Sequence, residues 1–295
     1  MVAATTSLRR DIANAGDLKT VVRTMKASAA AAIGQYERSV DALADYTRTV
    51  ELGLSVCLRQ HGNASGSQAT LTPEATAAAQ VVVFGSDQGL VGRFNAVVVD
   101  HALVAMAAVK TPVVWAVGAR ARALLEDAGV LCAGVFEVPS SVAMITRLVT
   151  QILSQVATEQ GDHGRVTPAL TLFYNQPKGR SGYAPVGLRL LPLDQRWQAS
   201  VAQQPWPAHA LPEVLGASAT ALRAFVREHL FVSLFQASAA SLASENASRL
   251  AAMQRADSNI AELLQTLQTR FHRLRQSGID EELFDVVAGF DALQA

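Results

Sequence analysis

Both ends of the chain carry a seven-residue hydrophobic repeat without any proline. In the N-terminal segment, apolar or small residues recur at Leu8, Ala15, Val22, Ala29, Tyr36, Leu43, Val50 and Cys57. A second set, offset by three, consists of Leu18, Met25, Ala32 and Tyr46 and is interrupted by Asp11, Ser39 and Gly53. This spacing predicts one long helix, reaching roughly 75 Å if about 50 residues are helical.

The C-terminal segment has the same character from about Leu215 to Arg275. One set of positions contains Met253, Ile260, Leu267 and Leu274, and the other contains Leu250, Leu264 and Phe271, with Asp257 as an interruption. Either repeat alone is also typical of an ordinary amphipathic core helix. Because two such segments flank one chain, we expect them to bury their seams against each other as an antiparallel coiled coil.

The middle of the chain has a different period. Short β-branched runs at Val81–Phe84 and Val113–Val117 each end at a glycine and precede a helix-length segment. Weaker strand candidates are 131–136, 170–174 and 186–191, and a helix is predicted over 142–158. Alternating strands and helices predict a Rossmann-like, doubly wound sheet, and the last two strands resemble a hairpin at its edge.

Composition shifts place the domain boundaries. Gly, Ser, Ala and Thr are frequent between the N-terminal segment and the middle of the chain, and several prolines lie between the middle and the C-terminal segment. We expect an N-terminal coiled-coil helix at 1–60, a linker at 61–80 and a central α/β domain at 81–192. A second linker at 193–213 and a C-terminal coiled-coil helix at 214–295 follow.

Charge and cysteine content narrow the function classes. The charges of the 25 basic and 25 acidic residues cancel, so no overall electrostatic field attracts the chain to nucleic acid or to an anionic membrane. Cys57 and Cys132 have no paired spacing, and the N-terminus has no secretory signal, so we expect a cytoplasmic protein. The apolar stretch Ala96–Val109 is too short to span a bilayer, and any membrane role is therefore expected to be peripheral.

The candidate chemistry is sparse. Gly85, Gly89 and Gly92 follow the first predicted strand, but their spacing fits neither a dinucleotide fingerprint nor a P-loop. We interpret them as a tight strand-to-helix turn in which glycines supply positive φ angles and Ser86 or Asp87 binds free amides. The histidines have no metal-ligand spacing. We therefore predict no catalytic site, metal or cofactor. A nucleotide-binding α/β enzyme and a coiled-coil adaptor remain the alternatives.

Three motifs, in order along the chain, resemble one known family. They are Leu18–Ala30, the turn Ser86–Asn95 and the C-terminal segments Ser241–Met253 and Arg275–Gly289. Together they are similar to the gamma subunit of F-type ATP synthases across nearly the whole chain. The departures at Gln88, Arg93 and Asp280 indicate a divergent branch, either an alternative synthase or a sodium-linked one.

The resemblance implies a central rotor shaft that couples ion flow through a membrane sector to ATP synthesis or hydrolysis in a surrounding ring. The implied partners are the alpha and beta subunits of the catalytic ring, the epsilon subunit and the ring of c subunits, and no nucleic acid. The shaft itself would be non-catalytic, although the whole complex is an ion-translocating ATPase. Its implied location is peripheral, on the cytoplasmic face of the bacterial inner membrane.

The resemblance also assigns contact residues. Met25, Lys26 and Arg249 match positions that face the acidic loop of the beta subunits. Arg275, Gln276, Asp280 and Glu282 match the segment that contacts the catch loops of the ring.

Overall fold

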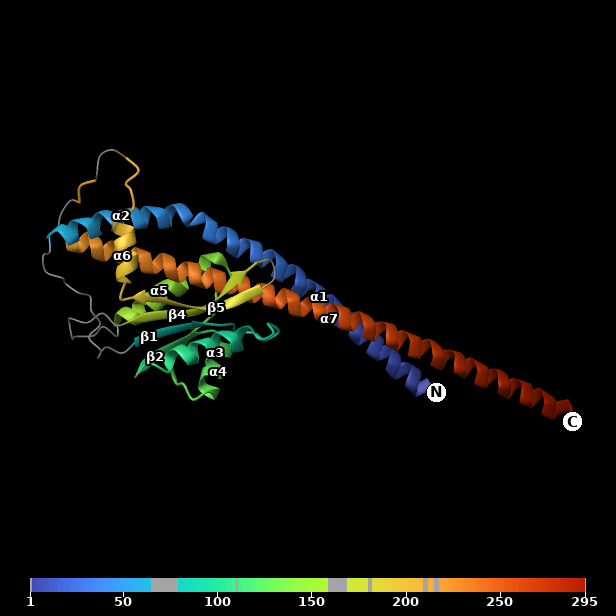
Figure 1. Ribbon diagram of the computed structural model, residues 1–295. Coiled ribbons are helices and arrows are strands. Elements are labelled where there is room, and N and C mark those ends of the chain that lie inside the picture. Colours follow the sequence, from blue (N-terminus) through green and yellow to red (C-terminus); the bar gives the residue numbers. More distant parts are fainter. Residues whose placement is uncertain are drawn as a thin grey trace. The chain divides into compact units, whose positions relative to one another are not determined.

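The computed structural model describes residues 2–64, 79–109, 111–158, 169–179, 182–208, 212–214 and 218–294 (Figure 1). The chain packs as two compact units. The helical-pair unit consists of Met1–Ala30 and Arg249–Ala295, and the sheet unit consists of Ala31–Ser248. Both divisions fall inside long helices, so the inner part of each helix belongs to the sheet unit.

The sheet unit is built on five strands in the order β3-β2-β1-β4-β5. The strands are β1 (Ala79–Phe84), β2 (Pro112–Val117), β3 (Cys132–Phe136), β4 (Leu170–Lys178) and β5 (Gly182–Leu191). The first four run parallel, and β5 pairs antiparallel with β4. The predicted doubly wound sheet with an edge hairpin is therefore confirmed.

Helices cover both faces of this sheet (Figure 1). On one face, Val81 and Val83 pack with α3 (Phe94–Met106) and α4 (Ala119–Asp127). On the other, Val82 and Phe84 pack with α5 (Val142–Thr158) and with the sheet-unit part of α7. Burial on both faces explains why the central strands are continuous apolar runs rather than alternating ones.

The N-terminal segment forms two helices, α1 (Val2–Ala42) and α2 (Ala44–Ala64), so the prediction of a single helix over 1–60 is wrong at Leu43. Two hydroxyl groups bond back to the helix around this break. Ser39 Oγ donates to the carbonyl of Tyr36, and Thr47 Oγ1 donates to the carbonyl of Leu43. Such side-chain bonds compete with the regular helical ladder and bend helices.

The predicted second linker also contains a helix, α6 (Gln195–Ala202), which corrects the expectation of an irregular segment over 193–213. The carboxylate of Asp194 caps it by accepting a hydrogen bond from the amide of Arg196 at 3.0 Å. Val201 is buried beside Val50 and Leu54 of α2, which supplies the tertiary stabilisation that so short a helix needs. Residues 65–78 of the predicted first linker lie outside the described residues.

The C-terminal segment is one helix, α7 (Ser218–Gln294), as the repeat predicts. None of the described helices has both the length and the hydropathy required to cross a bilayer.

Candidate functional site

The helical-pair unit packs α1 and α7 side by side along one of the predicted seams. Val22 of α1 is buried with Met253 and Ile260 of α7, and Met25 and Leu264 border this cluster. Of the two predicted sets on α1, the Val22 set is buried, whereas Leu18 of the other set is 52% exposed. Because Met25 of that same set borders the cluster, the second set is covered only in part, and the Val22 set forms the centre of the seam.

The two helices run antiparallel in this unit. The guanidinium carbon of Arg9 lies 5.7 Å from the ring centroid of Phe271, while Lys26 lies beside Asp257. Residue numbers thus rise along α1 as they fall along α7. The predicted antiparallel coiled coil is confirmed for the residues of this unit.

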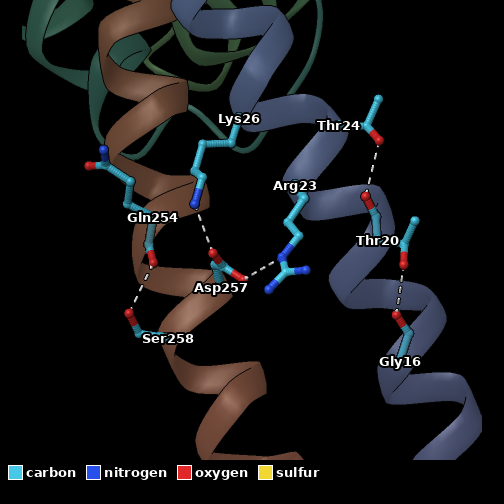
Figure 2. A network of polar contacts seen from close by, with 8 residues as sticks. All are labelled: Gly16, Thr20, Arg23, Thr24, Lys26, Gln254, Asp257 and Ser258. Carbon is cyan, nitrogen blue, oxygen red and sulfur yellow. Dashed lines mark hydrogen bonds and ion pairs between the residues drawn. The ribbon is translucent and has the colours of Figure 1, made fainter.

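A charged cluster crosses from one helix to the other (Figure 2). Lys26 Nζ donates to Asp257 Oδ2 at 2.8 Å, and Arg23 Nε lies 3.8 Å from Asp257 Oδ1. The hydrogen bond from Lys26 is the main reason that the pKa of Asp257 lies below its ordinary value, and the charges of Lys26 and Arg23 add to it. Asp257, which the sequence presented only as an interruption of the repeat, is thus the residue that joins the two helices in this cluster.

The proposed contact residues fall into two groups rather than one site. Met25, Lys26 and Arg249 are half-buried in the helical-pair unit. The second group, Arg275, Gln276, Asp280 and Glu282, is exposed on α7. The stretch from Asp257 to Arg275 alone spans about 27 Å at the rise of an α-helix.

An apolar stripe follows on the same helix. It consists of Ile279, Leu283, Phe284, Val286 and Val287, each at least 50% exposed. Because Arg9 lies beside Phe271, the residues before Arg9 extend α1 only to about residue 278 of α7. The stripe therefore lies on a part of α7 that continues past α1. Its helical spacing was a usable signal in the sequence, but no contact surface was predicted from it.

The glycine-rich turn after β1 is held by the protein's own groups. The amide of Ser86 donates to Asn95 Oδ1 at 2.8 Å, and Asn95 Nδ2 donates to Ser86 Oγ at 2.8 Å. A Cβ on Gly118 would come within 2.7 Å of the Ser86 backbone, so this neighbouring turn requires glycine. Such packing is typical of a structural turn.

The prediction that Ser86 or Asp87 binds free amides is confirmed for Asp87. Its two carboxylate oxygens accept from the amides of Ala119 and Val138 at 2.9 Å each. The positive φ angles occur at Gly92 and also at Leu90, with φ of 64°. Asp87 therefore ties together the loops after three parallel strands.

The chain is similar to proteins of one family over almost its whole length. A family model described as ATP synthase matches residues 4–293. The ATP synthase gamma chain of Rhizobium rhizogenes (strain K84) is 24% identical over 301 residues, which cover 97% of this chain and 98% of that one. The gamma chain of Anaeromyxobacter sp. (strain Fw109-5) is 27% identical over 296 residues, with the same coverage.

Solved structures with the same fold belong to rotary complexes. The rotor of the Euglena gracilis mitochondrial ATP synthase matches with a TM-score of 0.64 and 16% identity, covering 95% of this chain and 100% of that one. The central stalk and c-ring structure from Tetrahymena thermophila matches with a TM-score of 0.56 and 20% identity, covering 80% and 99%. These matches confirm the predicted fold class.

Proposed function

The chain belongs to the ATP synthase family, together with the gamma chains, and from this membership we propose that it is the central rotor shaft of a rotary F-type ATP synthase. In this role it couples ion flow through the membrane sector to ATP synthesis or hydrolysis in the surrounding catalytic ring. The shaft holds no cofactor and catalyses no reaction itself. Its contribution is to transmit rotation.

The observation that carries this proposal is the apolar stripe on α7. Five large apolar side chains, Ile279 to Val287, are exposed on a helix that continues past its partner helix. A contiguous apolar surface of this kind marks a site for a partner. A ring of subunits around the shaft would cover the stripe, whereas the stripe would have no function in an enzyme that works alone.

The helical pair also has the asymmetry that the role requires. Its two helices differ in sequence and length, and the charged cluster at Asp257 lies on one part of their surface. Each orientation of such a shaft would contact the three catalytic beta subunits differently. Differential contacts of this kind shift the populations of subunit conformations, and rotation is thereby coupled to catalysis.

The two groups of contact residues keep their proposed roles. We place Met25, Lys26 and Arg249 opposite the acidic loops of the beta subunits, and Arg275, Gln276, Asp280 and Glu282 opposite the catch loops. Because Lys26 forms a hydrogen-bonded ion pair with Asp257, part of its positive charge is already balanced within the chain. Arg23, whose side chain is 64% exposed, offers the more accessible cation beside it.

We propose that the sheet unit contacts the epsilon subunit and the ring of c subunits, which would carry protons or sodium ions. This places the protein on the cytoplasmic face of the bacterial inner membrane, where it is held peripherally through the complex. The names of the structures with this fold, a rotor and a central stalk with its c-ring, support the assignment.

Reconstitution tests the proposal. The chain is mixed with alpha and beta subunits purified from the same cells, and ATP hydrolysis is compared with that of alpha and beta alone. We expect an assembled complex with higher hydrolysis, and a probe fixed to the sheet unit should rotate when ATP is added. If the chain gives no active complex while a known gamma chain gives one, the proposal is wrong. Stoichiometric tight binding of ATP or NAD to the isolated chain would instead support an enzyme.

A further inference from the structure

The most deeply buried stretch of α7 in the sheet unit is unexpectedly polar. Ser241, Ser244, Glu245 and Asn246 are all at most 9% exposed. Burying polar groups is unfavourable unless hydrogen bonds compensate. An apolar helix would pack on a sheet more simply, so these residues require a specific reason.

Two serine hydroxyls on this stretch bind backbone carbonyls of the α/β core. Ser244 Oγ donates to the carbonyl of Asn175 in β4 at 3.0 Å, and Ser248 Oγ donates to the carbonyl of Val91 in the turn after β1 at 2.5 Å. The residue that carries the first of these carbonyls, Asn175, is 0% exposed, so the hydroxyl of Ser244 supplies a donor to a carbonyl that water does not reach.

A buried chain of hydrogen bonds links these two attachments. Asn175 Nδ2 donates to the carbonyl of Phe94 at 2.9 Å, and the adjacent Asn95 is bonded to Ser86. Asn175 and Ser86 are 0% exposed. The end of β1, the start of α3 and β4 are thus joined to α7 by directional bonds in a water-poor environment, where such bonds are strong.

We propose that Ser244 and Ser248 form a register clamp that fixes both the rotation of α7 about its own axis and its position along the sheet. Apolar packing is non-directional and tolerates sliding, whereas a slip of one residue would turn the helix by about 100° and remove both hydroxyls from their carbonyls. Because α7 continues unbroken past Ser248 into the helical-pair unit, the clamp holds the helix that forms the shaft against slip. This consequence rests on the proposed function, and the two serines are positioning residues in it.

The first test uses the full chain by itself. Ser244→Ala/Ser248→Ala removes both bonds, and Ser238→Ala is the matched control, because Ser238 is a buried serine of the same helix whose hydroxyl has no hydrogen-bond partner among the described residues. In hydrogen–deuterium exchange, we expect amides of 86–95 and 241–248 to exchange roughly tenfold faster in the double variant. The control should exchange like the parent. Equal exchange in all three proteins would overturn the clamp.

The second test uses the complex reassembled with its membrane sector in sealed vesicles, where ion pumping can be measured. We expect the double variant to retain ATP hydrolysis but to pump fewer ions per ATP hydrolysed, a ratio that a purely structural role would not change. An unchanged ratio, with exchange nevertheless faster, would overturn the role in coupling. Should the double variant not fold, Ser248→Ala alone, at a half-buried site, serves in both tests. If even the parent chain gives no active complex, the proposed function is wrong. The exchange measurement on the chain by itself still tests whether the two serines hold the helix in register.

Discussion

Replacing Asn95 with leucine should destabilise the sheet unit, although the leucine side chain has the same number of heavy atoms in the same branched arrangement. The Asn95 side chain is 7% exposed and makes two hydrogen bonds to Ser86, one from the backbone amide and one to the hydroxyl oxygen. Leucine fills the space but offers no polar atom. The amide of Ser86, in a residue that is 0% exposed, would lose its acceptor and gain no water in exchange.

The magnitude follows from those two bonds. A buried amide left without a partner costs about 1–3 kcal/mol, and the lost bond to the hydroxyl adds about 1 kcal/mol, which gives a total of about 2–4 kcal/mol. Asn95→Ala is the control for packing. If the hydrogen bonds dominate, leucine will be little better than alanine at this position, because both variants lack the acceptor.

Urea unfolding followed by tryptophan fluorescence measures this loss in the relevant unit alone. The chain has three tryptophans, Trp115, Trp197 and Trp206, and all of them lie in the sheet unit. We expect a lower midpoint for both variants at an unchanged slope. A leucine variant that unfolds at the same urea concentration as the parent, while the alanine variant does not, would mean that packing and not hydrogen bonding holds this turn.

Three further predictions concern other parts of the chain. The pKa of Asp257 is lowered, so the stability that this carboxylate contributes is present above its ordinary pKa of 3.8 and declines as the pH falls below that value. Asp257→Asn removes the charge that faces Lys26, and the variant should therefore lose less stability at acid pH in thermal melts followed by circular dichroism. An unchanged pH profile would contradict this prediction. Leu90→Asn should raise the stability of the sheet unit by about 1 kcal/mol in urea unfolding, because asparagine tolerates the left-handed conformation that leucine adopts there; a lower midpoint would refute the strain. Phe284→Lys should reduce the yield of complex with alpha and beta subunits more than Ser277→Lys, an exposed polar site on the same helix, and equal yields would count against the apolar stripe as a contact surface.

Local sequence patterns were enough to predict the main elements. The β-branched runs located the central strands, and the helix over Val142–Thr158 was predicted at its observed bounds. The seven-residue repeat located the buried seam at Val22, Met253 and Ile260. These predictions succeeded because periodic burial requires a regular spacing of apolar residues, which can be recognised within a short stretch of sequence.

Features that depend on partners distant in the chain were not predictable in the same way. The helix over Gln195–Ala202 was missed because prolines surround it and its burial depends on α2. The exposure of Leu18 was missed because both sets on α1 contain apolar residues, and only the path of α7 decides which side chains are covered. Tertiary packing overrode the local pattern in each case.

The candidate site divides along the same line. The resemblance to a known family supplied Met25, Lys26 and Arg249, but the tertiary structure alone paired Lys26 with Asp257, 231 positions away. It also joined Ser248 to Val91 across 157 positions. The sequence by itself therefore determined the helices, the strands and the buried seam, because hydrophobic periodicity is a local property of the chain. Only the folded structure decided which polar groups meet, because hydrogen bonds and ion pairs depend on distances of a few ångströms between segments that the sequence holds far apart.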